Sequence, residues 1–267
     1  MNATFVLIFA VLGGILPALF WLWFWIREDR LKPEPKYLLL ATFIGGIVAV
    51  STALFLEKYL YAIFYKASTS GVLIGKFWDY LYNFADKFSI SPEHIFLVLI
   101  ISPVIEEILK FIYTYFITLR RKDCDEPIDA SIYLITAALG FAAIENSLFL
   151  LTPYTKGIFD GINSGNFRSI GPMLIHLISS AVIGMFIGFT FYKSGFIKKI
   201  SATFGLLLAI MLHSAFNFFI ILNEATHNSN YFWIACLGVW TLMIILLYAF
   251  DRIKKVTSDK ACLITEE

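Results

Sequence analysis

Seven segments of the sequence are apolar over about 20 residues, the length that an α-helix needs to cross the hydrocarbon core of a bilayer. The composition agrees with this pattern, because 59% of the 267 residues are hydrophobic, 15% are charged and the mean hydropathy is +0.76. These values exclude an ordinary soluble domain. We therefore predict an all-α, polytopic transmembrane helix bundle of about seven spans. The predicted spans are residues 3–26, 37–57, 95–119, 130–152, 171–192, 200–223 and 231–250.

The stretch between the second and third spans follows a different pattern. Within residues 70–90, aromatic and apolar side chains recur at the spacing of an amphipathic helix, which predicts an extra helix lying in the membrane interface. The alternative is a simple extension of the second span. The residues that carry the pattern are Phe77, Trp78, Tyr80, Leu81 and Phe84.

Lysine and arginine are distributed unevenly among the connections, and this distribution predicts the orientation of the chain. Residues 27–36, 120–129, 193–199 and the tail from 251 hold 14 of them, whereas the alternate connections hold 6. The richer set is expected on the cytoplasmic side. We therefore predict a multi-pass protein of the cell membrane, with its N-terminus outside and a polar cytoplasmic tail over residues 253–267.

Two adjacent glutamates, Glu106 and Glu107, lie in the middle of the third predicted span. An ionised carboxylate at the centre of a bilayer costs at least about 2.5–3.5 kcal/mol. Lys110 is the only cation near them in the sequence. Carboxylates at this depth indicate a functional polar interior, unless Glu106 and Lys110 form a plain intrahelical ion pair.

Three later spans also carry polar groups. The helical rise places these groups and Glu106 between about 8 and 17 Å from the outer ends of their helices. Two of the groups continue stripes of small residues, which mark faces for close helix packing: His176 with Ser180, Gly184 and Gly188, and His213 and Asn217 with Gly205 and Ala209. We therefore predict one shared polar site. Its candidate residues are Glu106, Glu107, Glu145, His176, His213 and Asn217.

These side chains are of the types that a hydrolase uses. A carboxylate can take a proton from water and so create a nucleophile for a carbonyl. Either Glu106 or Glu107 can serve as this base, while the other orients it or pairs with Lys110. Asn217 supplies an amide donor for a developing oxyanion.

The two histidines have two possible roles. They can stabilise the oxyanion, or they can hold a divalent metal ion that acidifies the water. No HExxH motif is present, so a metal site would have to be assembled from different helices. His176, His213 and Glu145 are the candidate ligands, and no organic cofactor is expected.

Other interpretations remain at this stage. Glu145 and Asn146 can form a buried polar contact between helices, and each histidine can be a packing residue. A proton-coupled transporter also buries glutamate and histidine, although the two halves of this chain show no repeat. A non-catalytic membrane scaffold is a third possibility.

The charge pattern bears on the expected binding partners, and the cysteine spacing bears on the state of the thiols. The net charge of +1 says nothing about nucleic acid, but no basic cluster is interleaved with aromatic residues, so nucleic acid is not an expected partner. The lipid bilayer is an expected partner, because the predicted spans cross it. Cys124, Cys236 and Cys262 follow neither a zinc nor a disulfide spacing, so each is expected to be a free thiol.

Taken together, these motifs resemble the PrsW family of intramembrane proteases, which is distantly related to the CAAX prenyl endopeptidase and Abi family. The similarity runs in order along most of the chain. The matching runs are Arg27 to Arg30, Pro33-Glu34-Pro35, Glu106-Glu107-x-x-Lys110, Asp125 to Asp129, Gly140 to Asn146, Arg168, His176 with Gly184 and Gly188, and His213 to Phe218.

The resemblance implies that residues 1–252 form a polytopic intramembrane protease domain. Its substrate would be a single-span membrane protein, in bacteria typically an anti-sigma factor, cleaved near the extracytoplasmic side. The resemblance also implies that Glu106, Glu107 and His176 are the residues to test first, with Glu145 and His213 beside them. Because the family is described as metal-dependent, Zn²⁺ is the expected ion.

The CAAX prenyl endopeptidase group is the alternative family. It shares the double glutamate and a final HxxxN motif, here His213 to Asn217, but its middle motif is FxxxH where this chain has Phe141-x-x-x-Glu145. This difference favours PrsW. The chain also departs from PrsW at Ala130 and Ser214, where glycines are expected, and these changes remove no chemical group.

Overall fold

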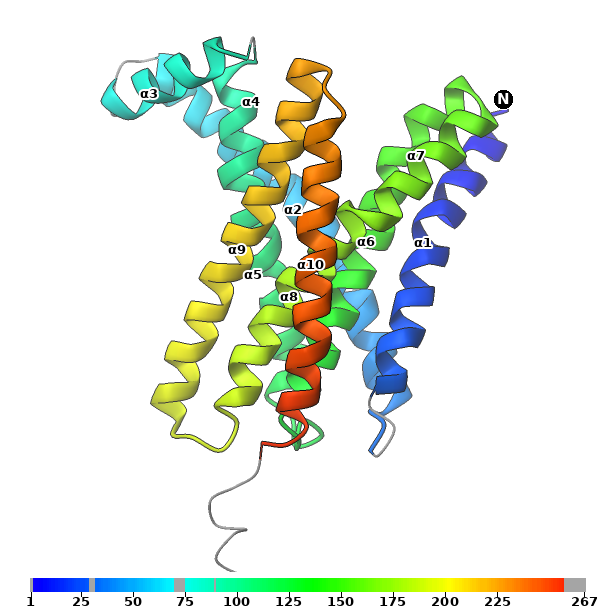
Figure 1. Cartoon of the computed structure of the whole chain (residues 1–267), viewed down its shortest axis with the longest axis vertical. Helices are drawn as coiled ribbons and strands as arrows, with labels where there is room; N and C mark the ends of the chain where they lie inside the picture. Colours follow the sequence, from blue (N-terminus) through cyan, green and yellow to red (C-terminus); the bar gives the residue numbers. More distant parts are fainter. Residues whose placement is uncertain (1, 29–31, 70–74, 89, 257–267) are drawn as a thin grey trace, which may run out of the picture.

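The computed structural model describes residues 2–28, 32–69, 75–88 and 90–256. The described residues form helices and contain no strand, which confirms the predicted all-α class (Figure 1). The α-helices are α1 (Ala3–Glu28), α2 (Lys36–Thr69), α3 (Gly75–Asp86), α4 (Pro92–Phe96), α5 (Ser102–Thr114), α6 (Asp129–Lys156), α7 (Ile158–Ile170), α8 (Pro172–Phe189), α9 (Gly195–Thr226) and α10 (Asn230–Ile253).

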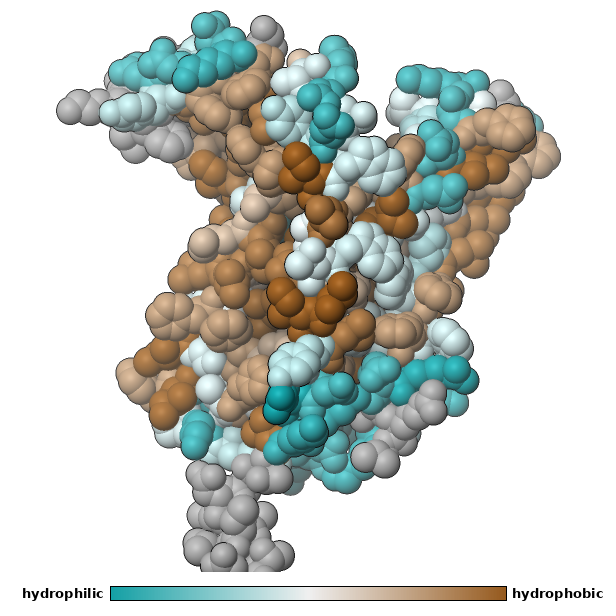
Figure 2. Space-filling model, viewed as in Figure 1, coloured by the Kyte–Doolittle hydropathy of each residue, from teal (hydrophilic) through white to brown (hydrophobic). Residues whose placement is uncertain are grey.

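Six helical segments in the described residues are long and apolar enough to cross a membrane, one fewer than predicted. Figure 2 shows the matching surface, with an apolar belt around the middle and hydrophilic residues gathered at the two ends. The six segments are Ala3–Glu28, Lys36–Lys66, Asp129–Lys156, Ile158–Phe189, Gly195–Thr226 and Asn230–Ile253.

The predicted span over residues 95–119 is the one outside this set. It is helical from Pro92 to Leu119, but two π-helical turns, η1 (Leu97–Ile101) and η2 (Tyr115–Leu119), divide it into short pieces. Pro103 follows the first π turn, and a proline has no N–H to donate to the preceding turn. At the second, Thr118 donates its hydroxyl hydrogen bond to the Thr114 carbonyl, which competes with the backbone ladder. The pieces still follow one another along the bundle (Figure 1).

The segment after the second span contains both features that the sequence left as alternatives. Helix α2 continues to Thr69, beyond its predicted end at residue 57, and the separate helix α3 follows at Gly75. Helix α3 lies across one end of the bundle and contacts α4 (Figure 1). Its location in a membrane interface remains a prediction.

Helix α6 is the centre of the bundle and packs against α1, α2 and α8. Its contact with α2 depends on two glycines. A Cβ on Gly46 would collide with the Ala137 carbonyl oxygen, and a Cβ on Gly140 would collide with the Phe43 carbonyl oxygen. Glycines at such a crossing let two backbones approach closely, as is common between helices in lipid.

The two small-residue stripes pack as the sequence predicted. Gly184 of α8 lies against the backbone of Ser131 in α6, and Gly205 of α9 lies against Ile183 and Phe186 of α8. Because His176 and His213 continue these stripes, the same contacts turn both imidazoles toward the interior.

The connections that are rich in lysine and arginine all join helices at one end of the bundle, which we call the basic end (lower end in Figure 1). Here Asp129 accepts hydrogen bonds from the backbone N–H groups of Asp125 and Glu126, at 2.8 and 2.7 Å. The Tyr133 hydroxyl donates to the Glu34 carboxylate. Burial, reinforced by these carboxylates, raises the pKa of the nearby Cys124 thiol to about 12. Most of the predicted tail lies outside the described residues.

Candidate active site

A cluster of ionisable side chains lies inside the bundle, where α5, α6, α8 and α9 meet. Helix α5 supplies Glu106, Glu107 and Lys110, and α8 and α9 supply His176 and His213; all five are buried. Helix α6 adds the partly buried Glu145. Five of the six predicted site residues therefore come together with Lys110.

Glu107 is held on both carboxylate oxygens. Lys110 Nζ lies 2.6 Å from Oε1, and both side chains are 0% exposed. His213 Nδ1 is 2.9 Å from the same oxygen, and the Ser180 hydroxyl donates to Oε2 at 3.3 Å. The lysine therefore pairs with Glu107, and not with Glu106 as in the intrahelical pair considered from the sequence.

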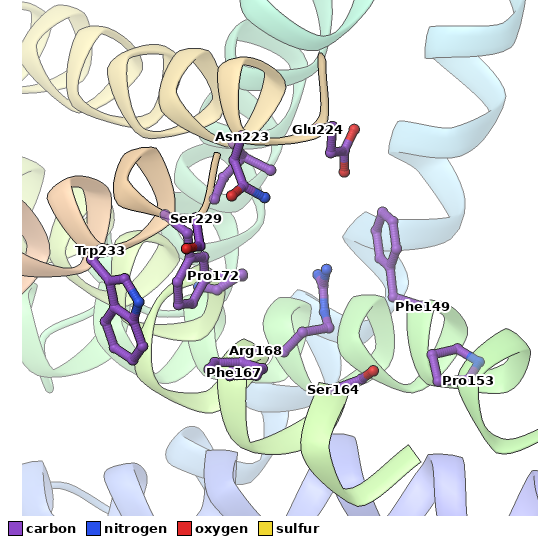
Figure 3. A pocket seen from close by; sticks show the side chains of 12 residues that line it. Phe149, Pro153, Ser164, Phe167, Arg168, Pro172, Asn223, Glu224, Ser229 and Trp233 are labelled. Carbon is purple, nitrogen blue, oxygen red and sulfur yellow. The ribbon is translucent and has the colours of Figure 1, made fainter. Parts of the chain in front are cut away.

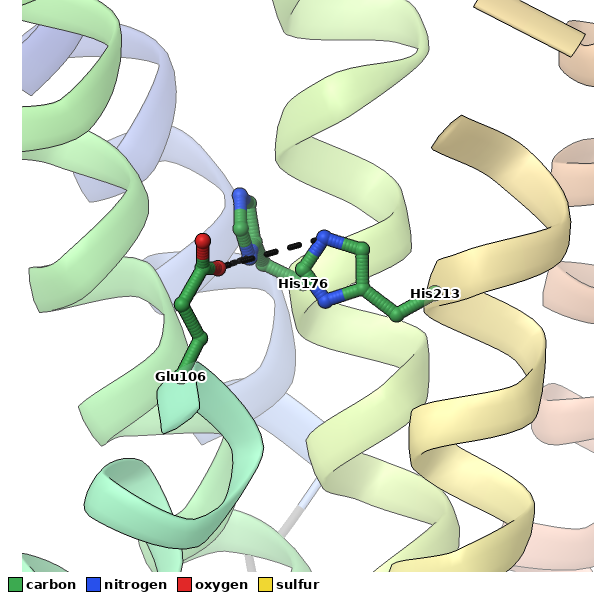
Figure 4. Close-up of side chains that lie close together, drawn as sticks. All are labelled: Glu106, His176 and His213. Carbon is green, nitrogen blue, oxygen red and sulfur yellow. Dashed lines mark ion pairs between the residues drawn. The ribbon is translucent and has the colours of Figure 1, made fainter. Parts of the chain in front are cut away.

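Glu106 has a different environment. Its Oε2 lies 3.6 Å from His176 Nδ1 and 3.9 Å from His213 Nε2, beyond hydrogen-bond distance (Figure 4). This buried oxygen has no hydrogen-bond partner within the described part of the chain. A buried polar atom without a partner is rare in proteins, and a catalytic role or a bound water or ion would account for it.

Each imidazole is held by a second carboxylate on its far side. His176 Nε2 lies 2.7 Å from Glu145 Oε2, and His213 Nδ1 lies 2.9 Å from Glu107 Oε1. Because an ionised carboxylate only accepts, these ring nitrogens carry the protons. The other nitrogen of each ring then has its lone pair on the side of Glu106, where that of His176 also accepts from Lys110 Nζ at 3.2 Å.

Glu106, His176 and His213 form a group whose ligand atoms lie within 4.8 Å of one another. Imidazole nitrogens with a carboxylate oxygen suit Zn²⁺, and a carboxylate behind each histidine is the usual support for a metal ligand. Lys110 Nζ also lies 3.2 Å from His176 Nδ1 and donates to it here. The sequence suggested Glu145 as the third ligand. In the structure Glu145 is hydrogen-bonded to His176 Nε2, the ring nitrogen that faces away from Glu106 and His213.

Arg168 of α7 extends the cluster toward one end of the bundle. Its Nε donates to Asn146 Oδ1 at 2.7 Å, and an Nη group lies 3.4 Å from Glu145 Oε2. The polar contact between helices that the sequence allowed for Glu145 and Asn146 is thus made with Arg168 of α7. Only the motif comparison drew attention to this arginine, because it lies outside the predicted spans.

Asn217 is the predicted site residue that does not join the cluster. Its Nδ2 donates to the Val98 carbonyl oxygen in the π turn η1, at 3.0 Å. The residue five positions after Val98 is Pro103, which has no N–H for the π-helical bond. Asn217 therefore supplies a donor that the backbone lacks.

A pocket of about 500 Å³ lies beside Arg168, between α6 and α7 on one side and α9 and α10 on the other (Figure 3). It is at the end of the bundle opposite the basic end. Its lining residues are Phe149, Pro153, Ser164, Phe167, Arg168, Pro172, Ile220, Asn223, Glu224, Ser229, Phe232 and Trp233.

Comparison with known families shows which family the chain belongs to. Residues 34–249 match the family described as PrsW family intramembrane metalloprotease, which is most of the chain. The chain belongs to the PrsW family.

Curated PrsW relatives show the same extent of similarity. The chain is 27% identical to Protease PrsW of Oceanobacillus iheyensis over 206 residues, covering 77% of this chain and 80% of the relative. It is 25% identical over 217 residues to the Geobacillus kaustophilus protein and 22% identical over 211 residues to the Bacillus subtilis protein. These alignments each cover 79% of this chain, and 80% and 82% of the two relatives. No solved structure gives a significant match.

PrsW membership decides between the functional classes that the sequence left open. The chain is a multi-pass membrane protease, and not a transporter, a scaffold or a CAAX prenyl endopeptidase. The family description also implies a metal ion. The residues present fit one, because Glu106 Oε2 has no partner and two imidazole nitrogens face it.

Proposed function

We propose that this PrsW protease hydrolyses a peptide bond in a single-span membrane protein, such as an anti-sigma factor, near the extracytoplasmic side. The observation that carries the proposal is the unpartnered Glu106 oxygen, which faces two imidazoles inside the bundle. Burying a carboxylate oxygen that accepts no hydrogen bond is costly, and a bound reactant or ion would offset that cost.

The position of the pocket supports the extracytoplasmic side. The pocket opens at the end opposite the basic end, and connections rich in lysine and arginine stay in the cytoplasm. A substrate whose span lies beside the bundle would present its outer flank at this level.

Glu106, His176 and His213 would hold a divalent cation such as Zn²⁺. Such an ion would polarise the scissile carbonyl and acidify the attacking water. Glu145 and Glu107 would keep the two imidazoles in the orientation that ligation needs, and Lys110 would balance the charge of Glu107.

We assign proton transfer to the oxygen of the Glu106 carboxylate that would not ligate the ion. It accepts a proton from the attacking water and returns it to the amine that leaves when the peptide bond breaks. Glu107 is assigned a positioning role, because Lys110, His213 and Ser180 already occupy its oxygens. Asn217 would hold α5 in register rather than contact the substrate.

Membrane proteomics tests the activity. Cells carrying the wild-type protein, Glu106→Gln, or the control Glu93→Gln would be compared for shortened single-span proteins. Glu93 lies in the first turn of α4, outside the cluster. We expect fragments cut on the outer flank with wild type and Glu93→Gln, and full-length proteins with Glu106→Gln. An identical fragment pattern in all three would contradict the proposed protease site.

Thermal unfolding of the purified protein tests the ion. Zn²⁺ added to chelator-treated protein at 100 times its Kd would stabilise the fold by about 2.7 kcal/mol, which raises Tm by roughly 5–10 °C. The shift should disappear in His213→Ala and persist in His94→Ala, because His94 is exposed on α4. An equal shift in both variants would place the ion elsewhere.

A further inference from the structure

We infer that the pocket in Figure 3 is a subsite for the substrate segment just outside its membrane span, and that it selects a basic residue there. The inference rests on the proposed protease function. Its volume of about 500 Å³ is that of a binding site for a few side chains.

The pocket begins one helical turn from the catalytic cluster. Phe149 follows Glu145 by four residues on α6, and Pro172 precedes His176 by four residues on α8. Four residues rise about 6 Å along a helix. When one part of a peptide lies in the pocket, the residues that follow it along the peptide are therefore within reach of Glu145 and His176.

Arg168 connects the pocket with the cluster. Its guanidinium group lies over the Phe149 ring, 3.9 Å from the centroid, and also contacts Glu145. The side chains of Arg168 and Glu145 are 20% and 21% exposed, whereas those of Glu107 and Lys110 are 0% exposed. Of these side chains, Arg168 also lines the pocket, so it is the link between the pocket and the cluster.

Four polar side chains around the pocket are free to bind a ligand. Ser164, Asn223, Glu224 and Ser229 make no side-chain hydrogen bond or ion pair with any described residue, although all four line the same cavity. An extended peptide has one N–H and one C=O per residue that need partners when it leaves water. These side chains can provide them.

The charge of the pocket favours a basic substrate residue. Arg168 is compensated by Glu145, so the Glu224 carboxylate is the charge without a counterpart in the pocket. The opposite wall consists of Phe167, Phe232 and Trp233, whose rings pack together, and Trp233 is 53% exposed. A lysine or arginine in this space would pair with Glu224 and lie against the indole.

A charge exchange between enzyme and substrate tests the subsite. The probes are two single-span reporters built from the protein that the proteomic comparison identifies, one with Lys and one with Glu on the outer flank. Glu224→Lys is compared with wild type and with Asp160→Lys, which makes the same charge change on an exposed residue of α7 outside the pocket. Full-length proteins in detergent are assayed for kcat and KM.

We expect Glu224→Lys to raise KM for the Lys reporter roughly fivefold to tenfold and to leave kcat within twofold. The Glu reporter should restore KM in Glu224→Lys, while Asp160→Lys should behave as wild type. As a second variant, Asn223→Ala should raise KM for both reporters.

Three outcomes would overturn the inference. Equal KM values for Glu224→Lys and wild type would exclude the subsite and leave the protease function intact. A raised KM that the Glu reporter does not restore would exclude a basic peptide residue as the occupant. Identical fragments with wild type and Glu106→Gln would remove the protease function itself, and the subsite with it.

Discussion

Adjacent residues on a helix point in directions about 100° apart, and this separates the environments of Glu106 and Glu107. Glu107 faces Lys110, Ser180 and His213 and is fully enclosed. Glu106 faces the lone-pair sides of both imidazoles and keeps an oxygen free. One carboxylate is therefore fixed by its partners and the other is available for a reactant.

The pair of Glu107 and Lys110 gives a prediction about stability. Glu107→Gln leaves the ammonium group of Lys110 buried without its counter-charge, so we expect the free energy of unfolding to fall by about 3–5 kcal/mol. Glu106→Gln removes no hydrogen bond and should keep wild-type stability while it lowers the cleavage rate by about 10²–10⁴-fold. Thermal unfolding and cleavage of the same preparations check both effects.

The double variant Glu107→Gln with Lys110→Met is the control for this prediction. It removes both charges, so most of the lost stability should return. Equal stability of Glu107→Gln and Glu106→Gln would contradict the assignment of different roles to the two glutamates.

At the scale of single elements, the π turn η1 precedes the helical turn that carries Glu106 and Glu107. Pro103 interrupts the backbone ladder of the helical run that carries Glu106, and Asn217 bonds the Val98 carbonyl from the neighbouring helix α9. This hydrogen bond therefore links helix α9 to the helical run that carries the two glutamates. Single π turns inside helices are frequent at functional sites.

Asn217→Leu tests this positioning role. We expect a loss of about 0.6–1.7 kcal/mol in stability, the range measured for hydrogen bonds between membrane helices, and a fall in cleavage rate of less than about tenfold. A donor to the oxyanion would behave differently, because its removal lowers kcat by about 10²–10³-fold. That larger loss, at unchanged Tm, would show that Asn217 acts on the substrate.

The position of Glu145 depends on how closely α6, which carries it, packs against α2. We expect Gly140→Ala to lower stability by about 1–3 kcal/mol, because the added methyl group meets the Phe43 backbone and separates the helices. Gly238→Ala on α10 is the matched control, with no atom within 4 Å of the added group. Thermal unfolding of the two variants should differ, and equal stabilities would refute the close crossing.

At the scale of the whole molecule, the two ends of the bundle differ in charge and in shape. The basic end is held together by hydrogen bonds of Asp129, Glu34 and Tyr133. The opposite end bears the pocket and α3. The cluster lies between the ends, and Arg168, which lines the pocket, contacts Glu145 of the cluster. Catalysis at the extracytoplasmic side therefore requires the basic end to face the cytoplasm.

Cysteine labelling in intact cells tests this orientation. In a Cys262→Ser background, a membrane-impermeant maleimide should label Asn228→Cys in the connection between α9 and α10, and Lys193→Cys only after lysis. Native Cys124 should stay unlabelled at neutral pH, because its raised pKa keeps the thiol protonated and the thiolate is the reactive form. Labelling of Lys193→Cys in intact cells would reverse the proposed sides.

Several features of the fold and site follow from the sequence alone. The lengths of the apolar segments predicted an all-α membrane bundle, because only helices or closed barrels satisfy their backbone groups in lipid. The high cost of burying Glu106, Glu145, His176 and His213 marked them as candidate site residues wherever they lie in the chain, and the structure brings them together. Small-residue stripes then predicted that the histidines point inward.

Only the tertiary structure decided how these groups are paired. The preference of Lys110 for Glu107, the choice of Glu106 as the third member of the possible ligand group and the bond between Asn217 and Val98 all depend on the rotation of one helix against another. The pocket likewise combines α6, α7, α8, α9 and α10. Spacing along a single helix carries no information about such contacts, because each is set by side chains that are distant in the sequence.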